Sequence, residues 1–324
     1  MNNETAAIQL MLTPGLGART LARLIDAAKV ARVPLSYLVE APVIELVSRF
    51  DLKEAIAQTL GQSRDEARRF ADSIAEKGLR TLLKYQRGYP DRLLESMGKD
   101  APPLLFAAGN VDLLSRESIA ICGSRTASAE GLQCASTIAG QIARAGYNIV
   151  SGYAAGVDSA AHAGALLAGR STTFVLAEGL LHFRPKDGLG ELLQEDNFAV
   201  VSEFLPDTRW AAHNAMQRNR TIIGLSSAVV IVESGLEGGT FDAGTAALKQ
   251  GAALFAVQFE TPPESAAGNA HFISKGARPL KILSNGKVDV GPVLAALQEK
   301  RHSGEIPGDG MLFPVHHPSL RKPA

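Results

Sequence analysis

The spacing of apolar residues divides the chain into two regions with different secondary structure. In the first ~80 residues, apolar positions recur three and four residues apart, as around Leu21, Leu24 and Ile25, and this spacing predicts amphipathic helices. Further helices are expected over residues 43–50, 53–60 and 64–77. From about residue 118 onward, short apolar runs of strand length alternate with helical segments.

The second region predicts an α/β fold with a mostly parallel sheet. Strands are expected near residues 118–123, 147–151, 172–177, 198–202, 228–233 and 253–258. The intervening helices are expected at about 130–145, 157–168, 187–195, 213–225 and 240–250. Buried strands that alternate with amphipathic helices are typical of a sheet covered on both faces, and such sheets bind ligands at the carboxyl ends of their strands.

Prolines and glycines mark the limits of these regions. Tyr89-Pro90 and Ala101-Pro102-Pro103 interrupt any helix in the connection that follows residue 80, and Leu104-Leu105-Phe106 is a short candidate strand. We therefore predict an all-helical domain over residues 1–80 and a sheet domain over 81–287. Over residues 288–324 we expect a short helix (292–300) and then a flexible tail without periodicity, with no winged-helix domain.

Glycines follow three of the predicted strands and suggest a site for a phosphate group. Gly123-Ser124-Arg125 ends the first strand, Gly152 and Gly156 follow the second, and Gly238-Gly239-Thr240 follows a later one. Glycine lets the backbone approach an anion, a helix N-terminus offers unpaired N–H groups, and arginine adds a forked cationic donor. A strand that ends in these residues just before a helix therefore predicts a phosphate cradle.

A compact polar segment lies between residues 210 and 220. Trp210 offers a flat surface for a base, and Arg218, Asn219 and Arg220 can donate to phosphate oxygens. Arg218 and Arg220 are about 200° apart on a helix, so they cannot share one face. The alternative is a solvated helix start in which a structural arginine pairs with an acidic side chain, Glu203 or Asp242.

The segment Pro14-Gly15-Leu16-Gly17 lies between two predicted helices. It has the shape of a helix-hairpin-helix turn, whose N–H groups can bind a DNA phosphate. The alternative is a plain tight turn inside a small helical bundle, and the sequence leaves both interpretations open.

Charge and composition limit the classes of function. The chain has 324 residues, with 33 basic and 33 acidic side chains, so any affinity for nucleic acid must come from a local patch. Cys122 and Cys134 are the only cysteines and are expected to be reduced and buried. We expect no membrane span, no signal peptide and a cytoplasmic protein. His316-His317 are expected to be solvated rather than to bind a metal.

Motifs for common enzyme chemistry are absent. The chain lacks the G-x-G-x-x-G fingerprint of dinucleotide binding and the G-x-x-x-x-G-K-[ST] of a P-loop. Asp158 and His162, four residues apart, could act together as a general base or as metal ligands, but helix capping by Asp158 and packing of His162 explain them better. No serine has a His/Asp relay, so we expect no catalysis, no metal and no cofactor.

Several motifs, in one order along the chain, resemble the DNA-processing protein A family (DprA, also called Smf). They are Pro14-Gly15-Leu16-Gly17, Gly88-Tyr89-Pro90, Ala101 to Phe106 with Gly109-Asn110, Ile119 to Arg125, Ser151 to Asp158 with Ala161-His162, Ser202-Glu203, Arg218-Asn219-Arg220 with Gly224-Leu225-Ser226, and Gly268-Asn269 with Gly276-Ala277.

The resemblance implies a sterile-alpha-motif-like helical domain followed by an extended Rossmann-type domain. It further implies a non-catalytic protein that binds single-stranded DNA, dimerises and helps to load the recombinase RecA during natural transformation. By the same resemblance, Gly123, Ser124 and Arg125 hold the DNA backbone together with Arg218, Asn219 and Arg220.

Two loops depart from the pattern of the family. Where the family has a tyrosine-proline segment and an asparagine, this chain reads Gly179 to Asp187, and its Phe183, Arg184 and Lys186 are the candidate contacts to a base and a phosphate. The loop Ser234 to Thr240 is also altered. It is similar to the P-G-G-x-G-T-x-x-E loop of phosphoribohydrolases, but position 243 is alanine rather than glutamate. The alternatives to DNA binding are therefore such an enzyme or a sensor of a small nucleotide.

Overall fold

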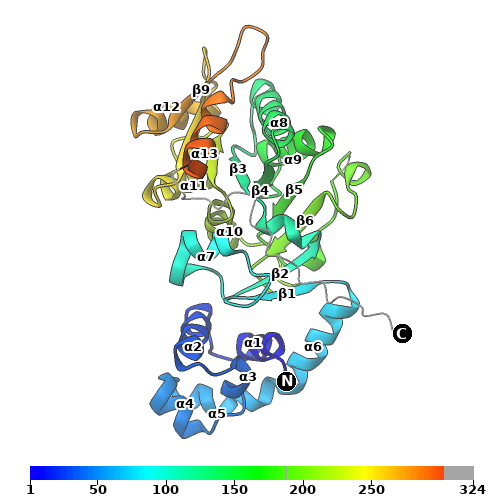
Figure 1. The fold of residues 1–324 in the computed structure, drawn as a ribbon, viewed down its shortest axis with the longest axis vertical. Coiled ribbons are helices and arrows are strands. Elements are labelled where there is room, and N and C mark those ends of the chain that lie inside the picture. The colour runs from blue at the N-terminus through cyan, green and yellow to red at the C-terminus, as the bar shows by residue number, and fades with distance from the viewer. Residues whose placement is uncertain (187, 303–324) are drawn as a thin grey trace, which may run out of the picture.

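A single sheet of nine strands organises the protein (Figure 1). The computed structural model describes residues 1–186 and 188–302. The strands, in chain order, are β1 (Arg80–Leu83), β2 (Leu104–Gly109), β3 (Ser118–Cys122), β4 (Asn148–Ser151), β5 (Thr172–Val175), β6 (Phe198–Ser202), β7 (Ala228–Ile231), β8 (Ala253–Gln258) and β9 (Arg278–Lys281). Their order in the sheet is β1-β2-β6-β5-β4-β3-β7-β8-β9.

All strands from β3 to β9 run parallel, whereas β2 pairs antiparallel with both β1 and β6. The prediction of a mostly parallel α/β sheet is thereby confirmed. The chain adds strands in one direction from β3 to β6 and in the other from β7 to β9. The point of reversal between β3 and β7 is a topological switch point, where open α/β sheets form their ligand crevices.

Helices cover both faces of the sheet because successive strand residues point to opposite sides. Ile119 and Ile121 of β3 pack under α8 (Ala129–Arg144), α9 (Val157–Leu167) and α13 (Gly291–His302). Ala120 and Cys122 face the other layer. That layer consists of α7 (Asp91–Met97), α10 (Ala212–Gly224), α11 (Gly239–Lys249) and α12 (Ala267–Ser274).

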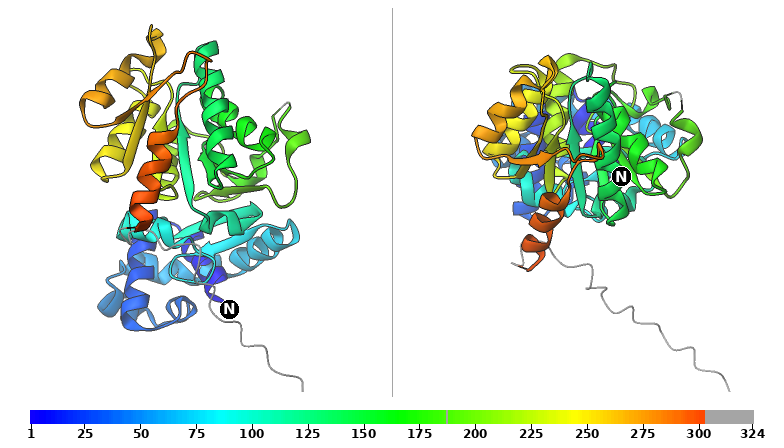
Figure 2. Two further views of the ribbon diagram at one scale, coloured as in Figure 1. Left: turned by 45° about the horizontal axis from the view of Figure 1, so that its top comes forward. Right: turned by 90° about the horizontal axis from the view of Figure 1, so that it is seen from above.

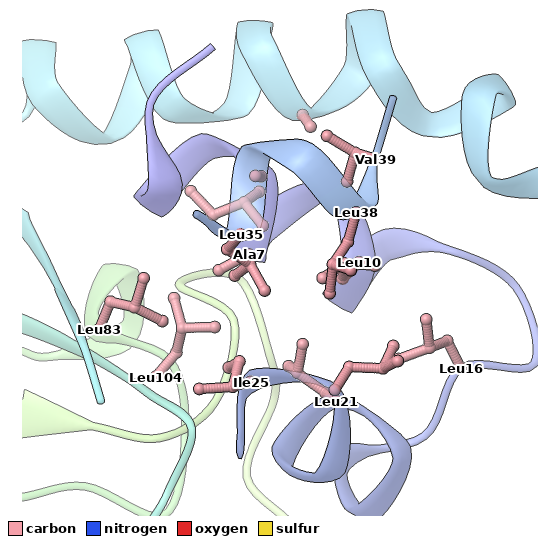
Figure 3. Packing of buried hydrophobic residues seen from close by; sticks show 14 of the residues in the cluster. Ala7, Leu10, Leu16, Leu21, Ile25, Leu35, Leu38, Val39, Leu83 and Leu104 are labelled. Carbon is pink, nitrogen blue, oxygen red and sulfur yellow. The ribbon is translucent and has the colours of Figure 1, made fainter. Parts of the chain in front are cut away.

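Six helices precede the sheet, and the apolar spacing predicts all of them except the four-residue helix at residues 35–38. They are α1 (Asn3–Leu12), α2 (Ala18–Ala31), α3 (Leu35–Leu38), α4 (Val43–Phe50), α5 (Glu54–Thr59) and α6 (Arg64–Glu76). In Figures 1 and 2 these helices, drawn in blue, lie together beyond β1 and β2, at the edge of the sheet that β1 forms. Their apolar core continues onto the sheet, because Leu10 and Ile25 belong to the same cluster as Leu83 and Leu104 (Figure 3).

A buried ion pair also joins the helices to the sheet. The Lys84 ammonium, whose side chain is 0% exposed, lies 3.0 Å from Asp26 Oδ1 of α2 and donates to the Lys99 carbonyl at 3.2 Å. The Tyr85 hydroxyl donates to the same carboxylate oxygen at 2.9 Å. The helical region is therefore anchored to the sheet by polar bonds as well as by apolar packing.

One predicted helix is wrong. Over residues 188–195, the expected helix is reduced to a single 3₁₀ turn, Gly190–Leu192. Gly188 has a φ of +76°, and a right-handed helix cannot continue through a residue with this backbone conformation. The sequence patterns also miss β1, β9 and α12, which are four to eight residues long. The helix expected at 292–300 is confirmed as α13, and the expected flexible tail lies beyond residue 302, outside the described residues.

The described residues include no helix that is long and apolar enough to cross a membrane. Both cysteines are free and buried, as expected, and burial raises the pKa of Cys122 to about 12 and that of Cys134 to about 11. In the same part of the chain no cluster of three metal-ligating side chains is present.

His162 predicts a dependence of stability on pH. Its ring is fully buried against Phe174, with a centroid distance of 4.0 Å, and its Nδ1 lies 2.7 Å from Thr172 Oγ1. Burial, together with the charges of Lys186 and Arg218, lowers the pKa of His162 to about 3. In the unfolded chain this pKa is about 6.5. The unfolded state therefore binds a proton that the folded state cannot accept, and stability falls as the pH drops from about 6.5 toward 3.

Between pH 7 and pH 5, we expect His162 to account for a loss of about 2 kcal/mol in the free energy of unfolding. Urea unfolding of the protein and of His162→Gln at both pH values measures this loss. The variant should lose about 2 kcal/mol less than the parent, and equal losses in the two proteins would show that His162 does not cause the dependence.

Candidate functional site

Three loops meet where β4, β3 and β7 end side by side in the sheet. Gly123-Ser124-Arg125 follows β3, Gly152 to Gly156 follow β4, and Ser234 to Thr240 follow β7. Together with α10 they enclose a pocket of about 430 Å³ at the switch point. This volume is within the roughly 300–1,000 Å³ of ordinary ligand pockets.

The glycines of the first two loops allow close packing of the loops. A Cβ at Gly123 would lie 2.5 Å from Val157 Cγ2, and one at Gly156, where φ is +77°, would lie 2.3 Å from the Ser124 carbonyl oxygen. A Cβ at Gly152 would lie 1.4 Å from Arg218 Nη1. These positions therefore exclude other residues because protein atoms already occupy the space.

The expectation that the N-terminus of the helix after β3 receives a phosphate is wrong for α8. The carboxylate of Glu233, which is 0% exposed, accepts hydrogen bonds there from the Ser128 N–H at 3.0 Å and from the Ser128 hydroxyl. The Ser265 hydroxyl donates to it at 2.7 Å. A Cβ at Gly131 would lie 2.0 Å from the same carboxylate. The protein thus supplies its own anion to this helix terminus.

Arg218 forms a cationic wall of the pocket. It is 6% exposed, and its nearest acidic partner is Asp158 Oδ2 at 3.7 Å, a distance too long for a hydrogen bond. Its Nε is buried without a partner among the described residues. Asp158 Oδ2 accepts from the Ala154 N–H at 3.3 Å, so Asp158 also holds the β4 loop. A buried guanidinium with unused donors is suited to an acceptor that enters from outside.

Arg125 and Trp210 form the exposed side of the pocket. The Arg125 guanidinium lies 5.5 Å from the centre of the Trp210 ring, and Trp210 is 51% exposed. Both residues, with Arg218 and Ala154, also line an adjoining pocket of about 200 Å³ that is bounded by the end of β5. Arg125 and Trp210 therefore lie between the two pockets, and the face of the Trp210 ring is accessible to a planar group.

The third loop and α10 complete the pocket. Gly238, with a φ of +90°, precedes α11, whose first residues Gly239 and Thr240 line the pocket. Asn219 Nδ2 donates to the Gly239 carbonyl at 3.0 Å and so joins α10 to this loop. Exposed Glu237 also lines the pocket and adds a negative charge.

Arg220 does not face this pocket. Arg220 is exposed and lines a separate cleft between α10 and the N-terminal helices. The expectation that Arg218 and Arg220 use different faces of the helix is confirmed. The structural pairing proposed with Glu203 is formed by other residues, because Gln217 and Thr221 donate to that carboxylate at 2.6 Å and 2.9 Å.

The candidates in the loop after β5 occupy structural positions. Lys186 Nζ donates to the carbonyls of Tyr153 and Ala154 and to the Ser159 hydroxyl at 2.7–2.9 Å, and burial lowers its pKa. Phe183 packs 5.1 Å from the Tyr153 ring. Both therefore hold the loop in place, and the three N–H donors of Lys186 Nζ are already used within the protein.

Arg184 is exposed, but its Nη1 donates to the carbonyls of Leu181 and Phe183.

Sequence reasoning missed Met216, a 52% exposed side chain in the pocket lining. Its position two residues before Arg218, on the exposed side of a helix, was the available signal.

These features define an open, doubly wound α/β protein with a pocket at the switch point and a buried, under-bonded guanidinium in its wall. The sequence profile described as DNA recombination-mediator protein A matches residues 80–286. The DNA processing protein DprA of Bacillus subtilis is 32% identical over 244 residues, which cover 74% of this chain and 81% of that protein. The chain therefore belongs to the DNA recombination-mediator protein A family.

Two solved structures are similar to this fold. DNA processing protein A from Streptococcus pneumoniae has a TM-score of 0.71 at 25% identity and covers 86% of this chain and 95% of its own. DNA processing protein A from Helicobacter pylori, described with its single-stranded DNA binding mode, has a TM-score of 0.55 at 26% identity. It covers 68% of this chain and 96% of its own.

Proposed function

We propose that the pocket at the switch point binds the phosphate backbone of single-stranded DNA without chemical turnover. The observation that carries this proposal is Arg218, a buried guanidinium whose Nε has no partner and whose ion pair with Asp158 is loose at 3.7 Å. A phosphate oxygen that enters the pocket would give this guanidinium, which lines the pocket, an acceptor. Membership of the family, and the single-stranded DNA binding of the Helicobacter pylori relative, support nucleic acid as the source of that phosphate.

The chemistry of the pocket mouth supports a flexible single strand over a duplex. Trp210 and Met216 are about half exposed and offer apolar surface to unstacked bases, while Arg125 adds a second cation beside Trp210. Contacts of this kind are tolerant of sequence, because every base has a π-face and the backbone is the same throughout.

Within this proposal the protein acts as a cytoplasmic homodimer that protects incoming DNA and loads the recombinase RecA during natural transformation. The family membership supports this role. Gly123, Ser124, Asn219 and Thr240 would shape the pocket around the phosphate, and Arg220 would contact the strand outside it. The enzyme alternative finds no support at the β7 loop, because the position three residues after Thr240 is Ala243, a buried side chain in the pocket lining.

Binding of a labelled oligothymidylate of about 35 nucleotides, followed by fluorescence anisotropy, tests this function. In a plot of the logarithm of affinity against the logarithm of salt concentration, two guanidinium contacts predict a slope of about −1.4 or steeper. A duplex of equal length should bind at least roughly tenfold more weakly. Tight binding of a nucleoside monophosphate with no binding of the oligonucleotide would favour the small-nucleotide alternative instead.

A further inference from the structure

The cleft lined by Arg220 lies between the N-terminal helices and the sheet domain. It encloses about 1150 Å³, which exceeds the roughly 1,000 Å³ at the upper end of small-molecule pockets. Its wall on the helical side includes Gly17, Ala18 and Arg19, which are the end of the Pro14-Gly15-Leu16-Gly17 turn and the start of α2. The turn that the sequence singles out therefore faces a large open space.

This cleft and the pocket at the switch point share a wall. Met216, Asn219 and Ala243 line both. Met216, Asn219 and Arg220 are three and four residues apart, so one face of α10 leads from the pocket into the cleft. A chain that is held at Arg218 would reach the cleft by crossing this shared wall.

Three cations from three different elements line the cleft. Arg19 comes from α2, Lys99 from the turn after α7, and Arg220 from α10. All three are exposed, and none forms a side-chain hydrogen bond or ion pair with a described residue. Arg23 also lines the cleft but is already bound to the carbonyls of Phe50 and Asp51 at the end of α4.

Four acidic residues line the cleft as well. Asp26 is paired with Lys84, and Glu203 accepts from Gln217 and Thr221 while burial raises its pKa. The exposed carboxylates of Asp100 and Asp242 remain. The three unpaired cations therefore outnumber the two exposed carboxylates.

Much of the remaining wall is apolar. It consists of Ala18, Ala22, Met97, Ala101, Pro102, Pro103, Met216, Ala243 and Ala246. A surface that mixes separate cations with small apolar groups matches a single strand, which carries spaced phosphates and unpaired bases.

We propose that the cleft between α2 and α10 is a second segment of the nucleic-acid interface, in which Arg19, Lys99 and Arg220 bind phosphates of the strand that continues from the switch-point pocket. This proposal rests on the proposed function of that pocket. It assigns the helical domain a direct contact with the strand, at the end of the proline-glycine turn.

Oligothymidylates of two lengths test this extension against the double variant Arg19→Glu/Lys99→Glu. We expect a tetranucleotide to bind at the pocket alone, so its affinity should be the same for the parent and the variant. An oligonucleotide of about 20 residues should bind the variant roughly 10- to 100-fold more weakly, and the slope of its salt dependence should decrease in magnitude by about 1.4.

The matched control is Arg170→Glu/Lys275→Glu, which makes the same charge change at exposed residues that line neither the pocket nor the cleft. Thermal unfolding verifies that both double variants are folded. Equal affinities of the parent and the cleft variant for the long strand, or equal losses for both lengths, would overturn the cleft proposal while leaving the pocket intact. Failure of the parent to bind either oligonucleotide would instead overturn the proposed function, and the extension with it.

Discussion

Replacing Arg125 with glutamate is expected to weaken binding of single-stranded DNA by roughly 30- to 150-fold. The guanidinium lies exposed at the pocket mouth over the face of Trp210 and forms no ion pair with a described residue, so it is free to bind a phosphate. Loss of a charge-assisted hydrogen bond, with repulsion by the new carboxylate, costs about 2–3 kcal/mol of binding free energy. Because Arg125 is exposed, the free energy of unfolding should change by less than about 0.5 kcal/mol.

Fluorescence anisotropy and urea unfolding of Arg125→Glu measure the two quantities separately. Arg170→Glu is the matched control, because Arg170 is exposed in the turn that precedes β5, at the amino end of that strand, whereas the pocket lies at the carboxyl ends of the strands. Unchanged affinity in Arg125→Glu would remove this residue from the interface, and an equal effect in the control would reduce the result to overall charge.

Replacing Arg218 with methionine should weaken binding further, by roughly 150-fold or more, since it removes the buried donors that we propose for the phosphate. The substitution also leaves Asp158, which is 7% exposed, without its cation. Removal of one partner from a buried ion pair destabilises proteins by about 3–5 kcal/mol. A loss of binding in this variant alone could therefore reflect a loss of folding.

The double variant Asp158→Asn/Arg218→Met separates these effects. The asparagine keeps an acceptor for the Ala154 N–H and removes the uncompensated charge, so stability should recover much of the loss. Affinity for the oligonucleotide should remain as low as in Arg218→Met. Recovery of binding together with stability would show that Arg218 supports the fold and does not bind phosphate.

Sequence patterns predict most of the fold because its central strands are long apolar runs. Residues such as Ile119 to Ile121 are buried on both faces, and the helices between the strands keep a regular apolar stripe. The short edge strands β1 and β9 are half exposed, with burial that depends on neighbours far away in the sequence. The false helix after β5 shows the same limit, since Gly188 and the packing of the loop decide its path.

The candidate site likewise has features that the sequence predicts and features that depend on distant residues. The convergence of three glycine-rich loops at one end of the sheet follows from the parallel direction of the strands, which the sequence indicates, although it does not give their order. The state of each polar group cannot, because it depends on distant partners. Glu233 neutralises the N-terminus of α8, and Lys186 donates to Tyr153, Ala154 and Ser159, although in the sequence this helix terminus and Lys186 both look available to a ligand.

The central claim is that the buried guanidinium of Arg218 receives a phosphate of single-stranded DNA. A crystal structure of the protein with a short oligothymidylate tests it most directly. The account predicts a phosphate oxygen within about 3 Å of a nitrogen of Arg218, with Arg125 beside it and a base against Trp210. A strand bound elsewhere on the protein, with no phosphate near Arg218, would contradict the account.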